Sequence, residues 1–372
     1  MQSLYFSVFK AISEAFSLII PFLCLSFSAP IAAQGFTLQS EFAKQKKYYP
    51  DILPFLPDTN GITIIHNVPY ATFSLDEVNT NDIATHLSHN PSPNTLQTPL
   101  QTQSLCLDIV LPNPSPQTPS TPSLRTPVII IHGGGWSSGD KTLDLPLAIM
   151  VARAGGVAFC INYRLSNQAL FPAAVQDVTQ AIAYVASVAD TLALNLNHLT
   201  LMGSSAGGQL AALVGAANGH VPHFLPQSTT LLTAPTPPSA TPIPHIHTVI
   251  VIDGVLAFIH PDSSEGADKP DKPSSATRWL GTPMAQDTAL WNYASPLSHL
   301  GLWTANRFVF INSARKRFSA GQAEFVTHLQ ALGKQTEQHP FPNTPHTFWL
   351  FHPWAPNVAR VVQNVVYELS KE

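Results

Sequence analysis

Short apolar runs alternate with longer amphipathic stretches over most of the chain. The clearest runs are largely apolar throughout and lie at 128–131, 157–161, 199–202, 249–252 and 308–311. Strands that are apolar on both faces are typical of a sheet covered on both sides. Helical periodicity fills the gaps at 145–154, 173–192, 208–217 and 322–332, and returns at 358–369. This alternation predicts an α/β fold, with a mostly parallel central sheet flanked by helices on both faces.

Two earlier runs, 62–66 and 105–111, are expected to add antiparallel strands at one edge of this sheet. Two other stretches, near 90–127 and 222–244, are rich in Pro, Ser and Thr, although the first is interrupted by the run 105–111. Proline cannot donate to a central ladder, so these stretches are predicted to be surface insertions. We therefore expect one α/β domain over residues 34–372, with Pro/Ser/Thr-rich insertions near 90–127 and 222–244.

The N-terminus resembles a secretory signal peptide. A weakly basic start with Lys10 precedes an apolar run, 16–27, and small residues follow up to Ala33. Its length and flanks favour a signal peptide over residues 1–33 rather than a spanning helix. The protein is therefore expected to be secreted or periplasmic, without stable membrane insertion after cleavage. The mature chain would keep Cys106 and Cys160, either as two buried thiols or as one disulfide.

Charge narrows the range of partners. The formal net charge is −4, and the dense basic runs, 44–47 and 315–317, are short. Nucleic-acid binding needs a clustered basic face, so no nucleic-acid partner is predicted. Nothing in the sequence sets the oligomeric state.

A candidate nucleophile follows one of the predicted strands. The run 199–202 leads directly into Gly203-Ser204-Ser205-Ala206-Gly207 and then into a helical stretch. A sharp strand-to-helix turn of this kind exposes the middle serine at the sheet edge, and the glycines let the chain turn and pack closely. Ser205 is therefore the predicted nucleophile of a serine hydrolase.

A second glycine-rich segment, His132-Gly133-Gly134-Gly135-Trp136, follows the run 128–131. Consecutive glycines at a strand end let backbone N–H groups reach a substrate oxygen. Together with the N–H of Ala206 they would form an oxyanion hole. The chain has no GxxxxGK[ST] sequence, so a phosphate-binding loop is the weaker interpretation. His132 is expected to shape this loop rather than to act as a base.

Serine needs a base near neutral pH, and in this type of hydrolase the base follows the nucleophile late in the chain. The late candidates are His328, His339, His346 and His352. His346 is favoured because it lies in a proline-bounded loop before the last predicted helix, and catalytic groups are commonly presented on loops.

The acid is left open between two carboxylates. It must orient the imidazole, which calls for a carboxylate on a loop beyond a late strand. Asp253 directly follows the run 249–252, although an Asp-Gly pair is also typical of a simple turn. The loop after 308–311 has no carboxylate before Glu324. Asp253 is the first choice, Glu324 the second, and a Ser–His dyad without an acid is the remaining alternative.

The order of these motifs resembles a known group. It is similar to the hormone-sensitive-lipase-like esterases and the related acetylxylan/feruloyl esterase-like (BD-FAE-like) group of the α/β-hydrolase superfamily, over about residues 60–370 without the insertions. The segments that carry the resemblance are His132–Trp136, Asn162–Ser166, Phe171–Asp177, Gly203–Gly208, Tyr293–Leu297 and Pro345–Trp349.

The resemblance implies an α/β-hydrolase fold, with Ser205 as nucleophile and His346 as base. It also implies oxyanion donors at Gly134, Gly135 and Ala206, and no need for a cofactor or a metal. The chain departs from the family pattern twice. The loop that usually carries an aspartate has about Lys316 there, which puts the acid in doubt, and Gln209 stands where a histidine often follows the paired glycines.

These features predict a serine carboxylic-ester hydrolase that acts on short acyl or aryl esters, including acetyl or feruloyl esters on carbohydrate, through an acyl-serine intermediate. Low charge and the Trp/Phe-rich late segment suit an apolar or sugar-stacking cleft. The alternatives are a hydrolase-fold binding protein whose catalysis is impaired, or a lipase or peptidase of the same fold.

Overall fold

The computed structural model describes residues 35–74, 102–113, 124–218, 243–269 and 271–372. The predicted signal peptide lies outside these residues, as does most of each predicted insertion. Export, the cleavage site and the domain boundaries therefore stay predictions.

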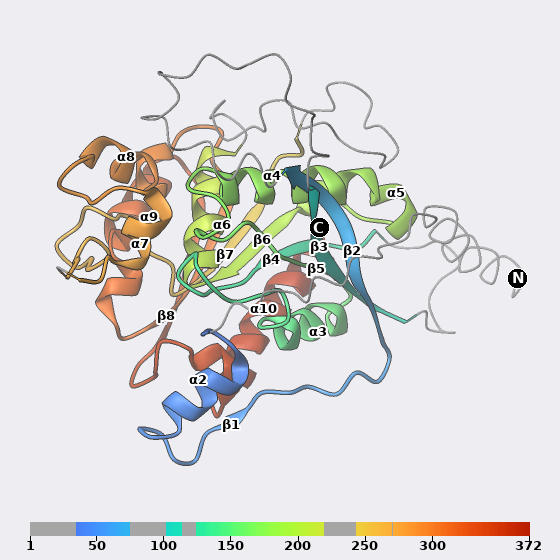
Figure 1. The fold of residues 1–372 in the computed structure, drawn as a ribbon. Coiled ribbons are helices and arrows are strands. Elements are labelled where there is room, and N and C mark those ends of the chain that lie inside the picture. The colour runs from blue at the N-terminus through green and yellow to red at the C-terminus, as the bar shows by residue number, and fades with distance from the viewer. Residues whose placement is uncertain (1–34, 75–101, 114–123, 219–242, 270) are drawn as a thin grey trace, which may run out of the picture.

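A central sheet runs through the molecule (Figure 1). Its strands are β2 (Ile62–Ser74), β3 (Thr102–Pro112), β4 (Pro127–Ile131), β5 (Val157–Ile161), β6 (Thr200–Ser204), β7 (Thr248–Ile252), β8 (Arg307–Ser313) and β9 (Gln335–Phe341). They lie in the order β2-β3-β5-β4-β6-β7-β8-β9. The pairs β2–β3 and β3–β5 are antiparallel, and the other neighbours are parallel. The predicted mostly parallel sheet with antiparallel strands at one edge is confirmed.

Helices cover both faces of this sheet, as Figure 1 shows. The α-helices of the described residues are α2 (Leu38–Gln45), α3 (Leu145–Arg153), α4 (Ala173–Ser187), α5 (Ala189–Leu192), α6 (Ala206–Ala217), α7 (Ser275–Leu280), α8 (Thr288–Tyr293), α9 (Gln322–Ala331) and α10 (Ala355–Leu369). Short 3₁₀ turns are η2 (Leu196–His198), η4 (Pro296–His299), η5 (Lys316–Ser319) and η6 (Phe348–Leu350). The α3 and α10 helices pack on one face, and α4, α5, α6 and α9 pack on the other.

Two details differ from the sequence-based picture. The helix expected over 173–192 is divided at Val188 into α4 and α5. The β9 strand was not predicted, because its residues are mostly polar and it contains Pro340. A strand at the edge of a sheet is only half covered, so it needs no apolar run and tolerates proline.

The N-terminal segment lies against the segment that follows His346. A two-residue strand, β1 (Leu53–Pro54), pairs antiparallel with β10 (Phe351–His352). The predicted aromatic cleft is wrong for Phe348, Trp349 and Phe351, because all three are buried in the core between the sheet and α10. Cys160 is a free, buried thiol, so the alternative of a Cys106–Cys160 disulfide is also wrong.

Candidate active site

Ser205 lies at the turn between β6 and α6, in a strained backbone conformation with φ 53° and ψ −118°. The turn is tight enough to require glycine on both sides. A Cβ at Gly203 would lie 2.1 Å from the carbonyl oxygen of Gly207, and a Cβ at Gly207 would lie 1.9 Å from that of Ile131. Because the neighbouring elements hold this conformation, the hydroxyl is presented at the carboxyl edge of the sheet.

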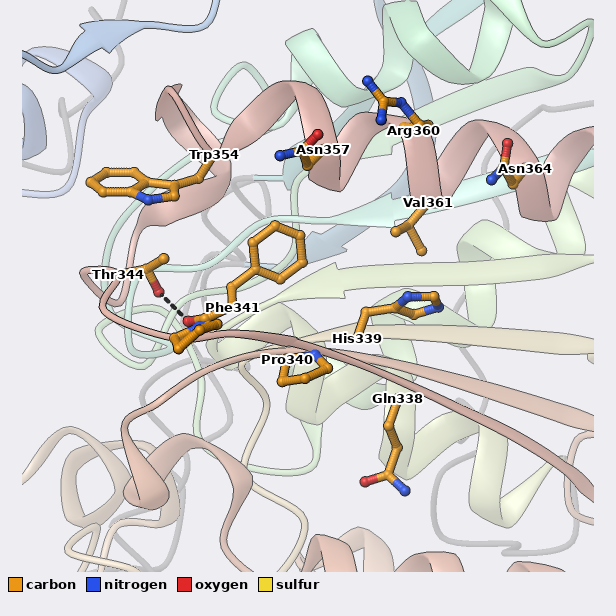
Figure 2. A pocket seen from close by; sticks show the side chains of 11 residues that line it. Gln338, His339, Pro340, Phe341, Thr344, Trp354, Asn357, Arg360, Val361 and Asn364 are labelled. Carbon is orange, nitrogen blue, oxygen red and sulfur yellow. Dashed lines mark hydrogen bonds between the residues drawn. The ribbon is translucent and has the colours of Figure 1, made fainter.

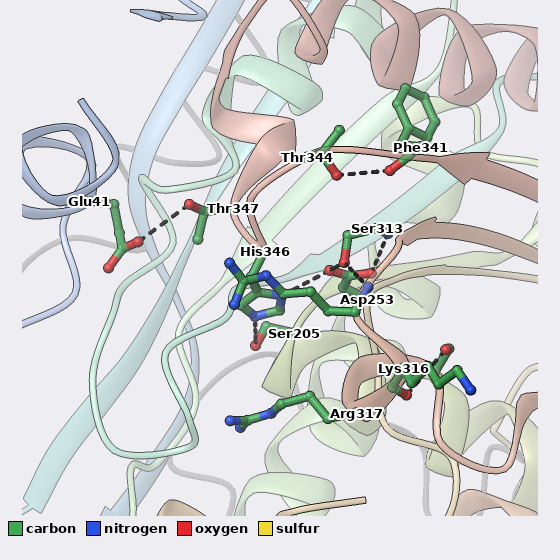
Figure 3. A network of polar contacts seen from close by, with 12 residues as sticks. Glu41, Ser205, Asp253, Ser313, Lys316, Arg317, Phe341, Thr344, His346 and Thr347 are labelled. Carbon is green, nitrogen blue, oxygen red and sulfur yellow. Dashed lines mark hydrogen bonds and ion pairs between the residues drawn. The ribbon is translucent and has the colours of Figure 1, made fainter. Parts of the chain in front are cut away.

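Three side chains form a continuous hydrogen-bonded chain at this edge (Figure 3). His346 Nε2 lies 2.8 Å from Ser205 Oγ, and His346 Nδ1 lies 2.9 Å from Asp253 Oδ2. The sequence-predicted nucleophile, base and first-choice acid are therefore brought together. Such a chain fixes the tautomer and the orientation of the imidazole and lets Nε2 accept the serine proton.

The other candidates lie elsewhere. Glu324 is on α9, with half of its side chain exposed, and it pairs with His260 at 3.3 Å rather than with His346. His352 is in β10, where its ring lies edge-on to Phe55.

Asp253 is buried at the end of β7 and is held by a serine from the next strand. The Ser313 N–H donates to Asp253 Oδ1 at 2.7 Å, and the Ser313 hydroxyl donates to Oδ2 at 2.7 Å. With the His346 bond, both carboxylate oxygens are engaged. These donors hold the carboxylate in the position from which it orients the imidazole.

The surroundings of His346 keep its imidazole neutral and fixed. Burial lowers the pKa of His346 below its usual 6.5, although Asp253 acts in the opposite direction. The Phe318 ring stacks on the imidazole with 3.4 Å between ring centroids and 7° between planes, and Trp349 lies edge-on at 5.4 Å. A neutral imidazole is the form that can act as a base near neutral pH.

The glycine loop lies directly beside the nucleophile. A Cβ on Gly133 would lie 3.1 Å from Ser205 Cβ, and one on Gly134, whose φ is +126°, would lie 1.9 Å from the Ser138 carbonyl oxygen. Among the described residues, the N–H groups of Gly134 and Gly135 have no hydrogen-bond partner. The N–H of Ala206 is also left over, because it begins α6. These donors are suited to bind a developing oxyanion.

His132 supports this loop, as the sequence suggested. Its ring stacks on Tyr163 at 4.4 Å, and its Nδ1 lies 2.7 Å from the Gly133 carbonyl oxygen. The Tyr163 hydroxyl donates to the His132 carbonyl oxygen at 3.0 Å. Burial lowers the pKa of His132 to about 4, so it stays neutral near pH 7 and serves to hold the loop.

Gln209, the second departure from the family pattern, joins two motifs. It is fully buried, and its Oε1 accepts from Trp136 Nε1 at 3.0 Å. Its Nε2 donates to the Ala294 carbonyl oxygen at 2.9 Å. Glutamine therefore supplies one acceptor and one donor at this position, which anchors the glycine loop to the segment after α8.

Sequence reasoning missed several supporting contacts. Ser313 and Phe318 carry no motif of their own, and they reach Asp253 and His346 only through the fold. Glu41 on α2 is buried and accepts from the Thr347 hydroxyl at 3.3 Å, although the two residues are 306 positions apart (Figure 3). A contact so distant in sequence leaves no local pattern.

A separate cavity of about 580 Å³ lies between β9 and α10 (Figure 2). Phe341, Trp354 and Arg360 are among its lining residues, and Ser205 and His346 are not.

Within the described ranges, His, Cys, Asp and Glu side chains form no group of three suited to a metal ion. Every helix in the part that the structure describes is too short or too polar to cross a membrane.

Comparison with known proteins assigns the family. The BD-FAE family model matches residues 107–316, more than half of the chain. AB hydrolase superfamily protein C1039.03 of Schizosaccharomyces pombe is 37% identical over 106 residues, which cover 28% of this chain and only 31% of that protein.

Solved structures agree on the fold. Esterase B of Lactobacillus Rhamnosis has a TM-score of 0.59 at 18% identity, covering 90% of this chain and 94% of that one. A truncated carbohydrate esterase from gut microbiota has a TM-score of 0.54 at 18% identity, covering 86% of this chain and all of that one. The chain therefore belongs to the BD-FAE family and has the α/β-hydrolase fold.

Proposed function

We propose that this protein is a serine carboxylic-ester hydrolase that acts on short acyl or aryl esters, including acetyl or feruloyl esters on carbohydrate. The observation that carries the proposal is the continuous contact from Asp253 through His346 to Ser205. An intact chain of acid, base and nucleophile supports an enzyme over a hydrolase-fold binding protein.

Acylation begins at the Ser205 hydroxyl. As Ser205 Oγ attacks the ester carbonyl carbon, its proton passes to His346 Nε2, 2.8 Å away. Asp253 stabilises the imidazolium that forms. The negative charge moves to the carbonyl oxygen, where the N–H groups of Gly134, Gly135 and Ala206 would bind it. One such donor is typically worth about 3–4 kcal/mol of transition-state stabilisation.

The tetrahedral intermediate then collapses. The imidazolium gives its proton to the leaving alcohol, and the acyl group stays on Ser205 as an ester. Water replaces the alcohol, His346 takes a proton from it, and the resulting attack releases the carboxylic acid and restores the serine. The chain, the ester and one water molecule supply every group in these steps.

The pKa of His346 predicts the pH dependence of this reaction. The base must be neutral, and burial lowers its pKa below 6.5. We therefore expect kcat/KM to rise with pH and to reach its plateau after a midpoint below 6.5. A profile of kcat/KM for 4-nitrophenyl acetate checks this, and a midpoint above 7 would contradict it.

The proposed substrate class is supported by the structural neighbours. A structural neighbour is described as a carbohydrate esterase, and another as an esterase. Hydrolysis rates over 4-nitrophenyl esters of increasing chain length, alongside acetate release from acetylated xylan, would rank short acyl, long acyl and carbohydrate esters. A marked preference for long chains would favour the lipase alternative.

Covalent labelling tests the mechanism. The wild-type protein should hydrolyse 4-nitrophenyl acetate and react with a fluorophosphonate at Ser205, and Ser205→Ala should do neither. Ser204→Ala is the matched control, because the adjacent Ser204 hydroxyl donates to Asp144 instead, at 2.9 Å. It should still be labelled. A wild-type protein that is neither active nor labelled would refute the proposed function.

We also propose that the protein is exported, because residues 1–33 resemble a signal peptide. Sequencing the N-terminus of the protein recovered from its native host would test this. A mature N-terminus at or near Gln34 supports export, and an intact Met1 in the cell pellet contradicts it.

A further inference from the structure

A cationic side chain lies beside the catalytic base. Arg317 belongs to η5, directly after the loop that ends β8. Its guanidinium carbon lies 4.5 Å from the centre of the Phe318 ring, and the same ring stacks on His346 at 3.4 Å. In Figure 3 the Arg317 side chain is drawn below Ser205, on the side opposite to His346 in this view. Arg317 is therefore separated from the catalytic base by one aromatic ring, and its side chain is 47% exposed.

The Arg317 guanidinium is held in place by one ion pair, and some of its N–H donors are not used in it. Arg317 Nη2 lies 2.7 Å from Oε1 of Glu265, and the Glu265 side chain is only 6% exposed, against 47% for Arg317. Within the described residues, its Nε and Nη1 have no partner. A guanidinium that is oriented by a buried carboxylate and by an aromatic ring can offer its remaining N–H groups to a second carboxylate.

The charge around Arg317 is positive on balance. Arg315 and Lys316 precede it, and both are exposed without an acidic partner among the described residues. Glu265 offsets one of these three charges. Two other carboxylates have partners of their own, since Asp253 binds His346 and Ser313, and Glu324 pairs with His260. Burial is the largest cause of the low pKa of His346, and Asp253 opposes it. The positive charge of Arg317 also lowers this pKa, so the electric field of Arg317 reaches the catalytic base.

We propose that Arg317 binds a carboxylate of the substrate, so that the enzyme prefers esters with a negative charge close to the bond that is cleaved. This inference rests on the proposed esterase function and narrows its substrate class to acidic esters, either half-esters of dicarboxylic acids or acyl esters of acidic alcohols. A charge-assisted contact to a half-exposed guanidinium is worth about a factor of ten in affinity.

Two matched substrate pairs separate the sources of the carboxylate. The 4-nitrophenyl ester of succinic acid, compared with its methyl ester, places the charge on the acyl side. 4-Acetoxybenzoate, compared with its methyl ester, places it on the alcohol side. The quantity to measure is the ratio of kcat/KM for the charged member to that for the neutral member, at low and high NaCl.

Wild-type enzyme should favour the charged member of at least one pair, and NaCl should reduce this preference. Arg317→Gln should lower the ratio about tenfold, because the contact to the carboxylate is lost. Arg317→Lys, which keeps the charge and much of the packing, should give an intermediate ratio. Arg153→Gln is the control, because Arg153 forms a similar ion pair with Asp58 at 2.6 Å on a different part of the surface. Its ratio should equal that of the wild type.

A binding measurement keeps this test separate from the esterase proposal. Dissociation constants of the same four esters for Ser205→Ala and for Ser205→Ala with Arg317→Gln report the preference without turnover. If wild-type protein cleaves no ester, the esterase proposal fails, and these constants still decide the role of Arg317. Equal affinity for charged and neutral members in both pairs, or a preference that survives Arg317→Gln, would overturn the inference.

Discussion

Asp144 is a buried carboxylate directly behind the nucleophile turn. It is 2% exposed at the start of α3, and its Oδ2 accepts from the Ser204 hydroxyl at 2.9 Å. Its Oδ1 has no hydrogen-bond partner in the described part of the chain. Burial raises the pKa of Asp144 to about 7, against the opposing effect of the Ser204 hydroxyl. Asp144→Asn removes this titration while it keeps an acceptor for Ser204.

The structure gives the sign and the size of the effect. The native state holds the Asp144 proton to a higher pH than the unfolded chain does, so its contribution to stability is complete below the unfolded pKa of 3.8 and is lost as pH rises through about 7. The difference between the two pKa values corresponds to about 4 kcal/mol of unfolding free energy, lost between pH 4 and pH 8. Asn cannot ionise, so the variant should lack this loss.

Urea unfolding at pH 5, 6, 7 and 8 measures the effect. The unfolding free energy of Asp144→Asn, relative to that of the wild type, should increase by about 3 kcal/mol between pH 5 and pH 8, the part of the total that this range covers. Asp51→Asn removes one carboxylate from an exposed position and serves as the control, with no such trend expected. If Asp144→Asn and wild type change in parallel over this range, Asp144 is ionised in the native state and the reasoning fails.

Three further predictions concern the site itself. Asp253→Asn should lower kcat by about 10³- to 10⁴-fold. Adding Ser313→Asp should recover part of that loss, because Ser313 Oγ lies 2.7 Å from the Asp253 carboxylate. If kcat does not recover, a carboxylate at the end of β8 cannot replace Asp253 beside the imidazole. Gly134→Ala should abolish soluble expression or activity, since its Cβ would lie 1.9 Å from the Ser138 carbonyl oxygen. Gly61→Ala is the control, because Gly61 has a positive φ of 75° but lies in open space, so thermal melts and activity assays of this variant report backbone strain alone. Thr347→Val should reduce the unfolding free energy by about 1 kcal/mol, because it breaks the hydrogen bond to Glu41, and it should lower kcat only a few fold. An unfolding free energy in urea equal to that of the wild type would show that this hydrogen bond does not contribute to stability.

The sequence was sufficient for the parts of the fold that are buried on both faces. Strands such as β4, β7 and β8 are fully buried, so their apolar runs mark them without further information. The edge strand β9 was not predicted, because it is half covered and its residues are mostly polar. The α4 and α5 helices were predicted as one helix, because apolar periodicity continues across Val188. Periodicity reports burial, so it loses information where burial is partial.

The site divides in a similar way. Ser205 and the glycine loop were identified because each lies on a tight turn that only particular residues can form, which gives a local signature. His346 was one of several late histidines, and its loop position selected it. Phe318, Ser313 and Glu41 act through contacts across the fold, so no window of sequence contains both partners of any of these contacts.

The acid illustrates how topology resolves what a motif leaves open. Neighbouring parallel strands β7 and β8 are in register, with Ile252 opposite Ile311, so the residues that follow them emerge at the same edge of the sheet. The Asp253 N–H donates to the Ile311 carbonyl oxygen at 3.0 Å, which ties the two strand ends together. A carboxylate at either end can then reach the same imidazole, and the serine at the other end can hold it. The lack of a carboxylate in the loop after β8 therefore does not imply a missing acid. Here the acid follows β7, and Ser313 at the end of β8 holds it against His346.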